Sequence, residues 1–372
     1  MNRLGLRLRP SMSACVAALA AAVGLAAAPA ASAEFVVKGR GFGHGIGLSA
    51  YGAYGYAKHG RSYESILAHY YKGTRLATVT GENVRVLVGG SERVFFSGAT
   101  RACGEHLKEK KRYRFERSAG GVALATNGGT RLAACGKAGG ARGGSTVTYA
   151  GYGDLRGELL AVATGGGLNA VNRVDVDEYV KGVVPNEVPS SWPGDALKAQ
   201  AVAARSIALS TSVDGDGFDL YDDTRSQVYE GKDSETAATN RIVKATAGEV
   251  VKHNGKVAVT YYSSTSGGRT ENVEFGFPGA EPVSYLKSVR DPYDDTSPYH
   301  RWRETFSRGE MESRLSGYVN GRLKAIDVTK TGISPRIVEA KVRGTGGSES
   351  ISGPTLQSRL GLLSTWAKFK RK

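Results

Sequence analysis

Residues 176–209 read VDEYVKGVVPNEVPSSWPGDALKAQAVAARSIAL, and this stretch contains the strongest secondary-structure signals in the sequence. Its second half predicts a helix over residues 193–211. Pro193 suits a first helical turn, Asp195 favours the positive end of the helix dipole, and the Ala-rich body has high helix propensity. A strand-like run precedes the stretch and leads into a turn. We therefore expect a strand, a stiff turn and a helix to follow one another here.

Glu187 stands in that turn, between Pro185 and Pro189. The prolines stiffen the backbone, and valines flank the carboxylate. Such a setting raises the pKa of a carboxyl group toward the range that a general acid needs at neutral pH. A solvated loop glutamate is the commoner outcome, because perturbed carboxylates are a minority. Spacing alone therefore leaves both interpretations open.

Two cations on the predicted helix form a candidate binding face. Lys198 and Arg205 are seven residues apart, which places both on one side of the helix. Small residues between them would let a ligand lie close, so this face could hold anionic groups of a substrate. An ordinary solvated helix face is the commoner alternative.

Outside this stretch the sequence predicts short strands and a few short helices. Residues 83–165 alternate β-rich runs with glycine clusters, and Asn254-Gly255 is a hairpin signal. Helices are predicted over residues 61–73 and 353–363. The predicted fold class is α+β, with mixed, largely antiparallel sheets and a few short helices around a substrate groove, plus a small β-rich subdomain.

The first 33 residues are typical of a secretory signal peptide. Arg3, Arg7 and Arg9 form a basic leader, an Ala-rich apolar run follows, and small residues precede Glu34. We expect a secreted, cell-wall location and no integral membrane segment in the mature protein. Removing three arginines and no acid lowers the formal net charge from +15 to +12.

A strongly basic exported protein is expected to meet anionic polymers. Cell-wall glycans and teichoic acids are the favoured partners, and nucleic acid is not expected. Charge that only maintains solubility is the alternative. After cleavage the chain keeps Cys103 and Cys135, and an exported chain favours a disulfide between them over a metal pair.

Residues 39–60 read GRGFGHGIGLSAYGAYGYAKHG and raise the question of a phosphate-binding loop. No frame of these glycines gives G-x-G-x-x-G, and no Lys-Ser or Lys-Thr follows. The stretch is therefore not interpreted as a nucleotide site.

Serine-nucleophile and metal patterns are also absent from the sequence. The run GLSAY misses G-x-S-x-G because Tyr51 replaces the last glycine. Residues 263–270 are interpreted as a polar binding loop, and a secreted serine hydrolase has little support. There is no H-E-x-x-H or C-x-x-C, so zinc on His44, His59 or His69 is a minor possibility and no metal is expected.

Several stretches together resemble the SpoIID/LytB family, the stage II sporulation protein D type of cell-wall protein. They are VDEYVKGVVPNEVPSSWPGDALKAQAVAARSIAL, DDTRSQVYEG, YYSSTSGGRTE, YLKSVRDPYD and GRGFGHGIGLSAYGAYGYAKHGRSYESILAHYYKGT. On this resemblance the predicted segments are residues 1–33 (signal peptide), 34–80 (glycine and histidine motif and helix, part of the core), 81–165 (small β-rich subdomain with the cysteine pair), 166–306 (SpoIID-like catalytic core) and 307–372 (C-terminal α+β segment).

The resemblance implies an enzyme that acts on peptidoglycan. Family members are lytic transglycosylases or regulators of wall hydrolases, and the sporulation members prefer glycan stripped of its peptides. Glu187 would be the catalytic acid and base, and Lys198 and Arg205 would hold lactyl carboxylates. No cofactor is expected. The other predicted substrate-binding residues are His44, Ser49, Gln227, Tyr229, Ser263, Ser264, Ser266 and Thr270.

The sequence departs from the family pattern in three places. DDTRSQVYEG lacks the Cys and His that bind zinc in some members, so no structural zinc is expected. Ala50 stands where a Gln usually follows Ser49. The glycine and histidine motif comes at the start of the chain instead of late, which resembles a circular permutation. A permuted chain requires its two mature ends to lie close together.

Two functions remain in view. The first is an exported lytic transglycosylase that cleaves MurNAc-GlcNAc strands. The alternative is a non-catalytic wall-binding module that localises or activates an amidase or another wall hydrolase, which would then be a second partner beside the glycan. The presence of Glu187 favours the enzyme, whereas Ala50 and the extra cysteine-bearing subdomain leave room for the binding module.

Overall fold

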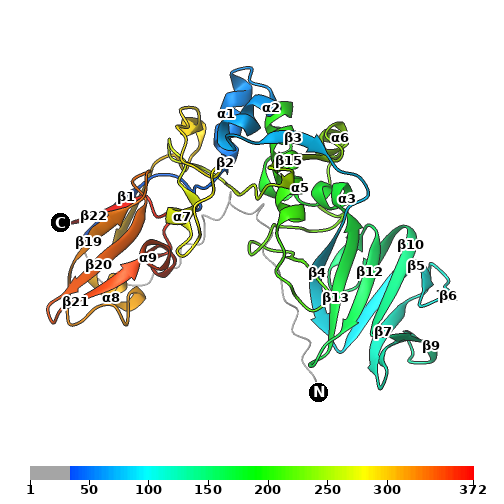
Figure 1. Ribbon diagram of the computed structural model, residues 1–372. Coiled ribbons are helices and arrows are strands. Elements are labelled where there is room, and N and C mark those ends of the chain that lie inside the picture. The colour runs from blue at the N-terminus through cyan, green and yellow to red at the C-terminus, as the bar shows by residue number, and fades with distance from the viewer. Residues whose placement is uncertain (1–33) are drawn as a thin grey trace, which may run out of the picture. The chain divides into compact units, whose positions relative to one another are not determined.

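The fold is α+β, as the sequence predicts, and a large sheet forms one part of it (Figure 1). The computed structural model describes residues 34–372, and the predicted signal peptide, residues 1–33, lies outside the described residues. In order across the sheet the strands are β14 (Leu220–Tyr221), β4 (Asn83–Ser91), β13 (Leu168–Asp175), β12 (Glu158–Ala163), β10 (Ala138–Tyr149), β5 (Arg93–Ala102), β7 (Tyr113–Ser118), β8 (Gly121–Thr126) and β9 (Arg131–Gly136), with β11 (Gly153–Leu155) on β10 and β6 (Glu105–His106) on β5.

The sheet is antiparallel apart from the pair β14–β4. Alternation along the strands explains how one face becomes core: Val84, Val86 and Val88 on β4 are buried. Cys103, just after β5, and Cys135 on β9 form a disulfide within this region.

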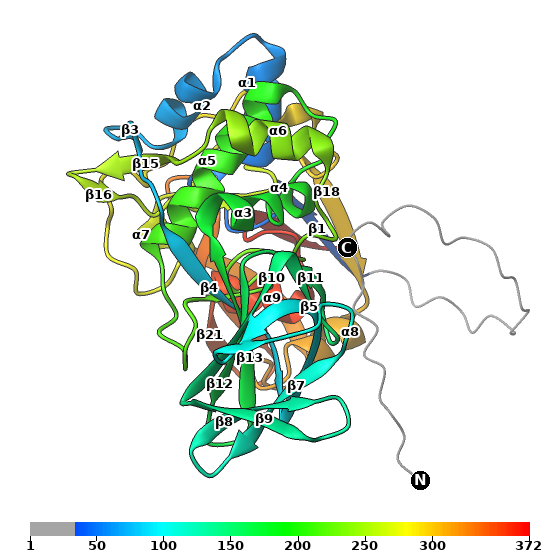
Figure 2. The ribbon, with the colours of Figure 1, turned by 90° about the vertical axis from the view of Figure 1, so that its right-hand side faces the viewer.

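Four helices follow strand β13 along the chain. They are α3 (Val176–Lys181), α4 (Val184–Glu187), α5 (Gly194–Ser210) and α6 (Ala237–Ala245). The predicted helix over residues 193–211 is confirmed as α5, with Pro193 as its N-cap residue. Figure 2 shows α3, α4 and α5 together near one end of β4 and β13; these elements share one core cluster, and another side of α5 enters a second cluster.

A second core cluster lies under the N-terminal helices and a small sheet. The sheet has the order β16 (Lys256–Val257), β15 (Glu249–His253), β3 (Arg75–Thr78). The predicted hairpin at Asn254-Gly255 is confirmed, because His253 pairs with Lys256 across these two residues. Other short elements here are α1 (Ala50–Lys58), α2 (Tyr63–Tyr70), β2 (Leu48–Ser49), β17 (Tyr262–Ser263), α7 (Val273–Gly276) and η1 (Asp294–Thr296).

The helix α1 is a feature that the sequence interpretation missed, since residues 39–60 were interpreted as a glycine loop. Two glycines in α1 are required by close packing and not by flexibility. A Cβ at Gly52 would collide with Tyr70 and Asp291, and one at Gly55 would collide with Tyr293. Tertiary contacts therefore override the low helix propensity of glycine here.

Two three-stranded sheets and two helices surround a third core cluster. One sheet has the order β18 (Trp302–Phe306), β1 (Phe35–Gly39), β22 (Ala367–Arg371), and the other has the order β19 (Leu323–Thr331), β20 (Ile337–Gly344), β21 (Ser348–Ser352). The helices are α8 (Arg308–Arg314) and α9 (Gly353–Leu360), so the helix predicted over residues 353–363 is present.

The first and last described strands pair with each other. In the antiparallel pair β1–β22, Phe35 lies opposite Arg371 and Gly39 lies opposite Ala367. The expectation that the two mature ends lie close together is therefore confirmed. The circular permutation itself stays a prediction, as do the proposed segment boundaries. Among residues 34–372 no helix is both long and apolar enough to cross a bilayer.

Candidate active site

Glu187 is the last residue of the short helix α4, in a segment held by buried valines. Its amide N–H donates to the carbonyl of Val183 at 3.2 Å, and the next amide, of Val188, donates to Val184 at 3.1 Å. All three valines are buried. The turn that the sequence predicted to be stiff is thus fixed by both proline geometry and packing.

The carboxyl group of Glu187 is half-buried and accepts two hydrogen bonds. The amide N–H of Val228 donates to Oε1 at 3.3 Å, and the hydroxyl of Tyr262 donates a second bond. Burial raises the pKa of Glu187, while both hydrogen bonds lower it by stabilising the carboxylate. The net shift is upward, so burial is the larger effect.

A chain of side chains sets the direction of the Tyr262 proton. Tyr179 donates its hydroxyl proton to Oε1 of Gln227 at 3.2 Å, so the amide nitrogen of Gln227 faces Tyr262 and donates to its hydroxyl oxygen at 2.8 Å. The Tyr262 proton is then directed to Glu187. Burial and the nearby Glu187 carboxylate raise the pKa of Tyr262, which keeps it protonated.

The predicted residue Gln227 therefore reaches the Glu187 cluster, whereas Tyr229 does not. Tyr229 is buried, and its hydroxyl donates to Asn172 at 2.7 Å. Tyr262 and Tyr179 were missed by the sequence reasoning. Tyr262 directly precedes the polar run 263–270 that the sequence singled out, so the signal lay one residue outside it.

The glycine and histidine loop supports Tyr262 from the backbone side. Strand β2 pairs with β17 in parallel, with Leu48 opposite Tyr262. The His44 ring accepts the Ile46 N–H at Nδ1, at 3.0 Å, and its other nitrogen donates to the carbonyl of Tyr262. Burial and the Arg336 charge lower the pKa of His44 to about 4, so the ring is neutral. Both of its nitrogens are already in use.

Glycine at two positions of this loop is required by geometry. Gly45 and Gly47 have φ angles of 72° and 69°, in the left-handed region that favours glycine. A Cβ at Gly45 would collide with the guanidinium of Arg336, and one at Gly47 would collide with the carbonyl of Tyr261. At these two positions glycine is needed for backbone conformation and close packing, and not for binding a phosphate.

Most of the predicted polar binding loop is turned into the protein. Ser49 accepts hydrogen bonds from the amides of Gly52 and Ser266, and Thr270 accepts one from the amide of Val289. The hydroxyl groups of Ser49 and Thr270 thus hold backbone segments in place. Ser266 donates to Asp294, Ser264 bonds to the Thr265 hydroxyl, and the buried hydroxyl of Ser263 has no hydrogen-bond partner among the described residues. Their contact with substrate stays a prediction.

Lys198 and Arg205 do not share an open face, which corrects the expectation from helical spacing. Arg205 has 0% exposed surface. Its Nε donates to Asp177 at 2.7 Å, and its Nη1 donates to the carbonyl of Glu249 at 2.9 Å. The side of α5 that carries Arg205 packs against neighbouring elements. Lys198 is half-buried, lies over the ring of Tyr63, and reaches Asp195 at 3.7 Å.

Three aromatic rings cluster around Trp192, which is five residues after Glu187 in the chain. The ring centroids of Tyr51 and Tyr54, both on α1, each lie 5.0 Å from that of Trp192. All three rings are half-buried. Half-buried aromatic rings are common in ligand sites because they combine an apolar face with polar edges.

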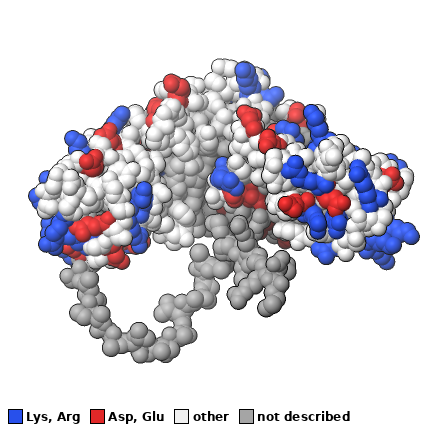
Figure 3. Space-filling model, turned by 90° about the horizontal axis from the view of Figure 1, so that it is seen from below, with Lys and Arg blue, Asp and Glu red and all other residues white. Residues whose placement is uncertain are grey.

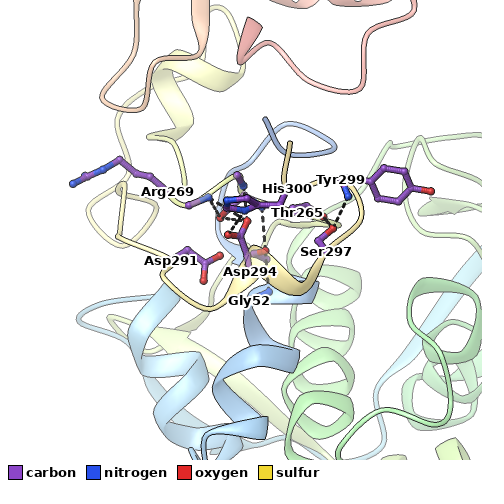
Figure 4. Close-up of polar contacts among 12 residues, drawn as sticks. Gly52, Thr265, Arg269, Asp291, Asp294, Ser297, Tyr299 and His300 are labelled. Carbon is purple, nitrogen blue, oxygen red and sulfur yellow. Dashed lines mark hydrogen bonds and ion pairs between the residues drawn. The ribbon is translucent and has the colours of Figure 1, made fainter. Parts of the chain in front are cut away.

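A buried acidic cluster holds the loop next to β17 (Figure 4). Oδ2 of Asp294 accepts the Ser266 hydroxyl at 2.9 Å and the amides of Gly267 and Gly268 at 2.6 and 3.2 Å, and Oδ1 lies 2.9 Å from Nδ1 of His300. Asp291 accepts the hydroxyl of Tyr70 at 2.8 Å.

The sequence reasoning gave Asp291 and Asp294 no role, although both lie in the stretch YLKSVRDPYD that carries the family resemblance. Burial first, and the Asp294 charge second, raise the pKa of Asp291 to about 7. Within residues 34–372 no group of three or more His, Cys, Asp or Glu side chains is placed to hold a metal ion.

Part of the chain is similar to a known protein family. Residues 164–253 match the family model "SpoIID: Stage II sporulation protein", a range that contains Glu187 and Gln227 but neither the glycine loop nor Tyr262. Stage II sporulation protein D of Bacillus subtilis is 30% identical over 219 residues, and that of Bacillus amyloliquefaciens is 32% identical over 221 residues.

These matches cover 54% and 55% of this chain and 62% of each relative, so the chain spans less than two thirds of their length. A third relative, an amidase enhancer of Bacillus subtilis, is 36% identical over 151 residues, which is 41% of this chain and 19% of the enhancer. The family model and these relatives agree: residues 164–253 belong to the SpoIID family, and the chain is similar over about half of its length to stage II sporulation protein D.

Proposed function

We propose that this protein is exported and cleaves peptidoglycan glycan strands as a lytic transglycosylase, with Glu187 as general acid and base. The observation that carries the proposal is the Glu187 carboxyl group, which is half-buried, has a raised pKa, and is oriented by Tyr262 and Val228. The family match over residues 164–253 supports it, because that range contains Glu187.

The chemistry needs one carboxyl group. The protonated Glu187 would donate its proton to the glycosidic oxygen as the C1–O bond breaks. The 6-hydroxyl of the same sugar would attack C1 and give its proton to the Glu187 carboxylate, which closes the 1,6-anhydro ring. The proton returns to Glu187, and no water is consumed. This arrangement differs from the two-carboxylate arrangement of ordinary glycosidases.

The raised pKa fits the first step of this sequence. A general acid must be protonated before the reaction, and burial keeps a larger fraction of Glu187 protonated than an exposed carboxyl group would have. Tyr262 donates to the carboxylate form, so it stabilises the state left after the proton has gone to the leaving oxygen.

Substrate would lie along the partly open residues near α4 and α5. The rings of Tyr51, Tyr54 and Trp192 offer apolar surface to sugar rings, and Lys198 offers a charge to a lactyl carboxylate. Glycan stripped of its peptides exposes these carboxylates. The buried Arg205 would act on this site only through the position of α5.

A second candidate function rests on the relative named amidase enhancer. In that case the same surface would bind wall glycan without cleaving it, and an amidase would be the partner. The two functions differ in one observable, namely whether the protein alone releases anhydro-ended fragments.

The test is mass spectrometry of soluble products from stripped and intact peptidoglycan. Residues 34–372 should release 1,6-anhydro fragments, and Glu187→Gln should lower the rate by about two to four orders of magnitude, the range for a general acid. Glu230→Gln changes an exposed glutamate two residues after Val228; it is the matched control and should leave the rate unchanged.

Three outcomes distinguish the catalytic function from the binding function. Fragments from the wild type and the control alone establish catalysis by Glu187. Fragments from all three proteins would overturn the role of Glu187. No fragments from any of them, with each protein still pelleting with the wall, would establish the binding function in place of the enzyme.

A further inference from the structure

The sheet β18–β1–β22 has two unlike faces. Register places Phe35 and Val37 of β1, Phe306 of β18 and Ala367 of β22 on one face, where they are buried in the third core cluster. Residues at the alternate positions lie on the other face. That second face carries basic side chains, which have no role in the packing of the core.

Three cations stand in one row across this second face. Lys38 on β1 lies directly opposite Arg303 on β18 and Lys368 on β22. All three are exposed, and none forms an ion pair within the part of the chain that the structure describes. The nearby Glu34 pairs instead with Arg308 and Arg371.

Like charges placed directly opposite each other destabilise a sheet. Elsewhere on the molecule basic and acidic side chains are interspersed, as Figure 3 shows for one face and as the ion pair Arg142–Glu158 illustrates. The unpaired row Arg303–Lys38–Lys368 therefore carries a cost in folding free energy that an anionic ligand would offset.

The row lines a hollow that continues into a second one. The first hollow, of about 450 Å³, is also lined by Arg40 and Arg301. Burial first, and the Arg301 charge second, lower the pKa of Arg40. The second hollow, of about 540 Å³, shares Arg40 and Trp366 with the first and adds Arg269 and Arg290.

The tryptophans of the two hollows are already engaged by protein groups. The guanidinium carbons of Arg40 and Arg336 lie 5.3 and 5.4 Å from the Trp366 ring centroid. The indole N–H of Trp302 donates to the carbonyl of Gly41 at 2.9 Å. What the hollows offer to a ligand is therefore charge more than stacking on bases or sugar rings.

We propose that these two hollows bind a phosphodiester-linked polyol polymer, an anionic wall polymer of the teichoic-acid type. Such a polymer carries a negative charge on every unit, so consecutive phosphates can meet consecutive cations, and Arg suits phosphate through paired hydrogen bonds. Peptide-stripped glycan carries one lactyl carboxylate per disaccharide and would leave most of the row unpaired. The inference rests on the wall location in the proposed function, but not on catalysis by Glu187.

The test compares two variants that lose the same charge. One is the row variant Lys38→Gln/Arg303→Gln/Lys368→Gln. The other is the control Lys108→Gln/Lys110→Gln/Lys111→Gln, whose lysines are exposed between β6 and β7. Binding of residues 34–372 to poly(glycerol phosphate) is measured by calorimetry at physiological salt. We expect the row variant to bind at least about tenfold more weakly with a shallower salt dependence, and the control to bind like the wild type.

Several results would overturn the proposal. If both variants lost the same affinity for poly(glycerol phosphate), net charge alone would explain the binding. If neither variant lost affinity, the hollows would not be the binding site. Equally tight binding of oligo(dT) or polygalacturonate, with the same sensitivity to the row variant, would show a general polyanion surface instead of a phosphodiester site.

Two further measurements separate this proposal from the catalytic one. Cleavage of short soluble stripped glycan by the row variant should be unchanged, so a failure of Glu187 catalysis and a failure of phosphate binding appear in different assays. The row variant should also melt at a higher temperature than the wild type, because the repulsion is removed. A lower melting temperature would contradict that repulsion.

Discussion

The side-chain amide of Gln227 donates a hydrogen bond of 2.8 Å to the hydroxyl of Tyr262, and this bond decides where the Tyr262 proton points. Tyr179 donates to the carbonyl oxygen of Gln227, and in this orientation the amide nitrogen of Gln227 faces Tyr262. The hydroxyl of Tyr262 is left as a donor to Glu187. Buried aromatic residues thus set the electrostatics of the candidate acid.

Tyr262→Phe should move the pH profile of glycan cleavage upward. The hydrogen bond from Tyr262 lowers the pKa of Glu187, so its removal raises that pKa. A general acid works in its protonated form, so the alkaline fall in activity should shift to higher pH by about one to two units. This size follows from about 1.5–3 kcal/mol for a hydrogen bond to a charged group and 1.36 kcal/mol per pKa unit.

The matched control is Tyr261→Phe, since Tyr261 is the adjacent residue and no hydrogen bond joins its hydroxyl to Glu187 in the described structure. Its pH profile should coincide with that of the wild type. A downward shift in Tyr262→Phe, or equal shifts in both variants, would remove Tyr262 from the control of the Glu187 proton.

Asp291→Asn should change how stability depends on pH. The pKa of Asp291 is raised to about 7, so between its ordinary value and 7 the folded state holds a proton that the unfolded state has lost. Stability is then fully present at low pH and falls as pH rises through about 7. The variant should lack this fall and melt at a higher temperature than the wild type at pH 8.

Asp294→Asn is the contrast, because the Asp294 carboxylate accepts bonds from Ser266, Gly267 and Gly268. Replacing one carboxylate oxygen of Asp294 by an amide group should destabilise the fold by about 1–3 kcal/mol at pH 8. If both variants had the same thermal profile against pH, the two carboxylates would not differ in the way that the structure indicates.

The sequence predicts those elements whose signals are local. Helix α5 and the Asn254-Gly255 hairpin follow from propensity and turn chemistry within a few residues. Helix α1 does not, because Gly52 and Gly55 lower its intrinsic propensity. It is stabilised by close packing of these glycines against Tyr70 and Tyr293, which no local sequence pattern reveals.

The candidate site divides in the same way. Glu187 can be picked from its proline-flanked, apolar neighbourhood, because that neighbourhood is local in sequence. The network through Tyr179, Gln227 and Tyr262 joins residues up to 83 positions apart, and only the fold brings them together. Helical periodicity also placed Arg205 on a face of α5 without showing that this face is buried.

Removal of the disulfide should loosen the β-rich part of the large sheet. Cys103 and Cys135 are 32 residues apart, and a loop of that length corresponds to about 3–4 kcal/mol of unfolding free energy in the chain-entropy model. Cys103→Ser/Cys135→Ser should therefore shift the first denaturant transition to a lower concentration. The reduced wild type should behave like the double variant, and a midpoint that is insensitive to reductant would contradict this contribution.

Arg205 and Lys198 should differ sharply when each is replaced by a neutral side chain. Arg205→Met leaves Asp177 without its buried partner, and breaking such a pair costs about 3–5 kcal/mol. Lys198→Met removes a half-buried cation with a weak contact to Asp195 at 3.7 Å, so its melting temperature should stay close to the wild-type value. Binding to stripped glycan should show the opposite order in the folded proteins: weaker for Lys198→Met, and unchanged for Arg205→Met measured well below its melting temperature. Loss of glycan binding by a folded Arg205→Met, with Lys198→Met unaffected, would return Arg205 to the binding surface and require α5 to move when glycan binds.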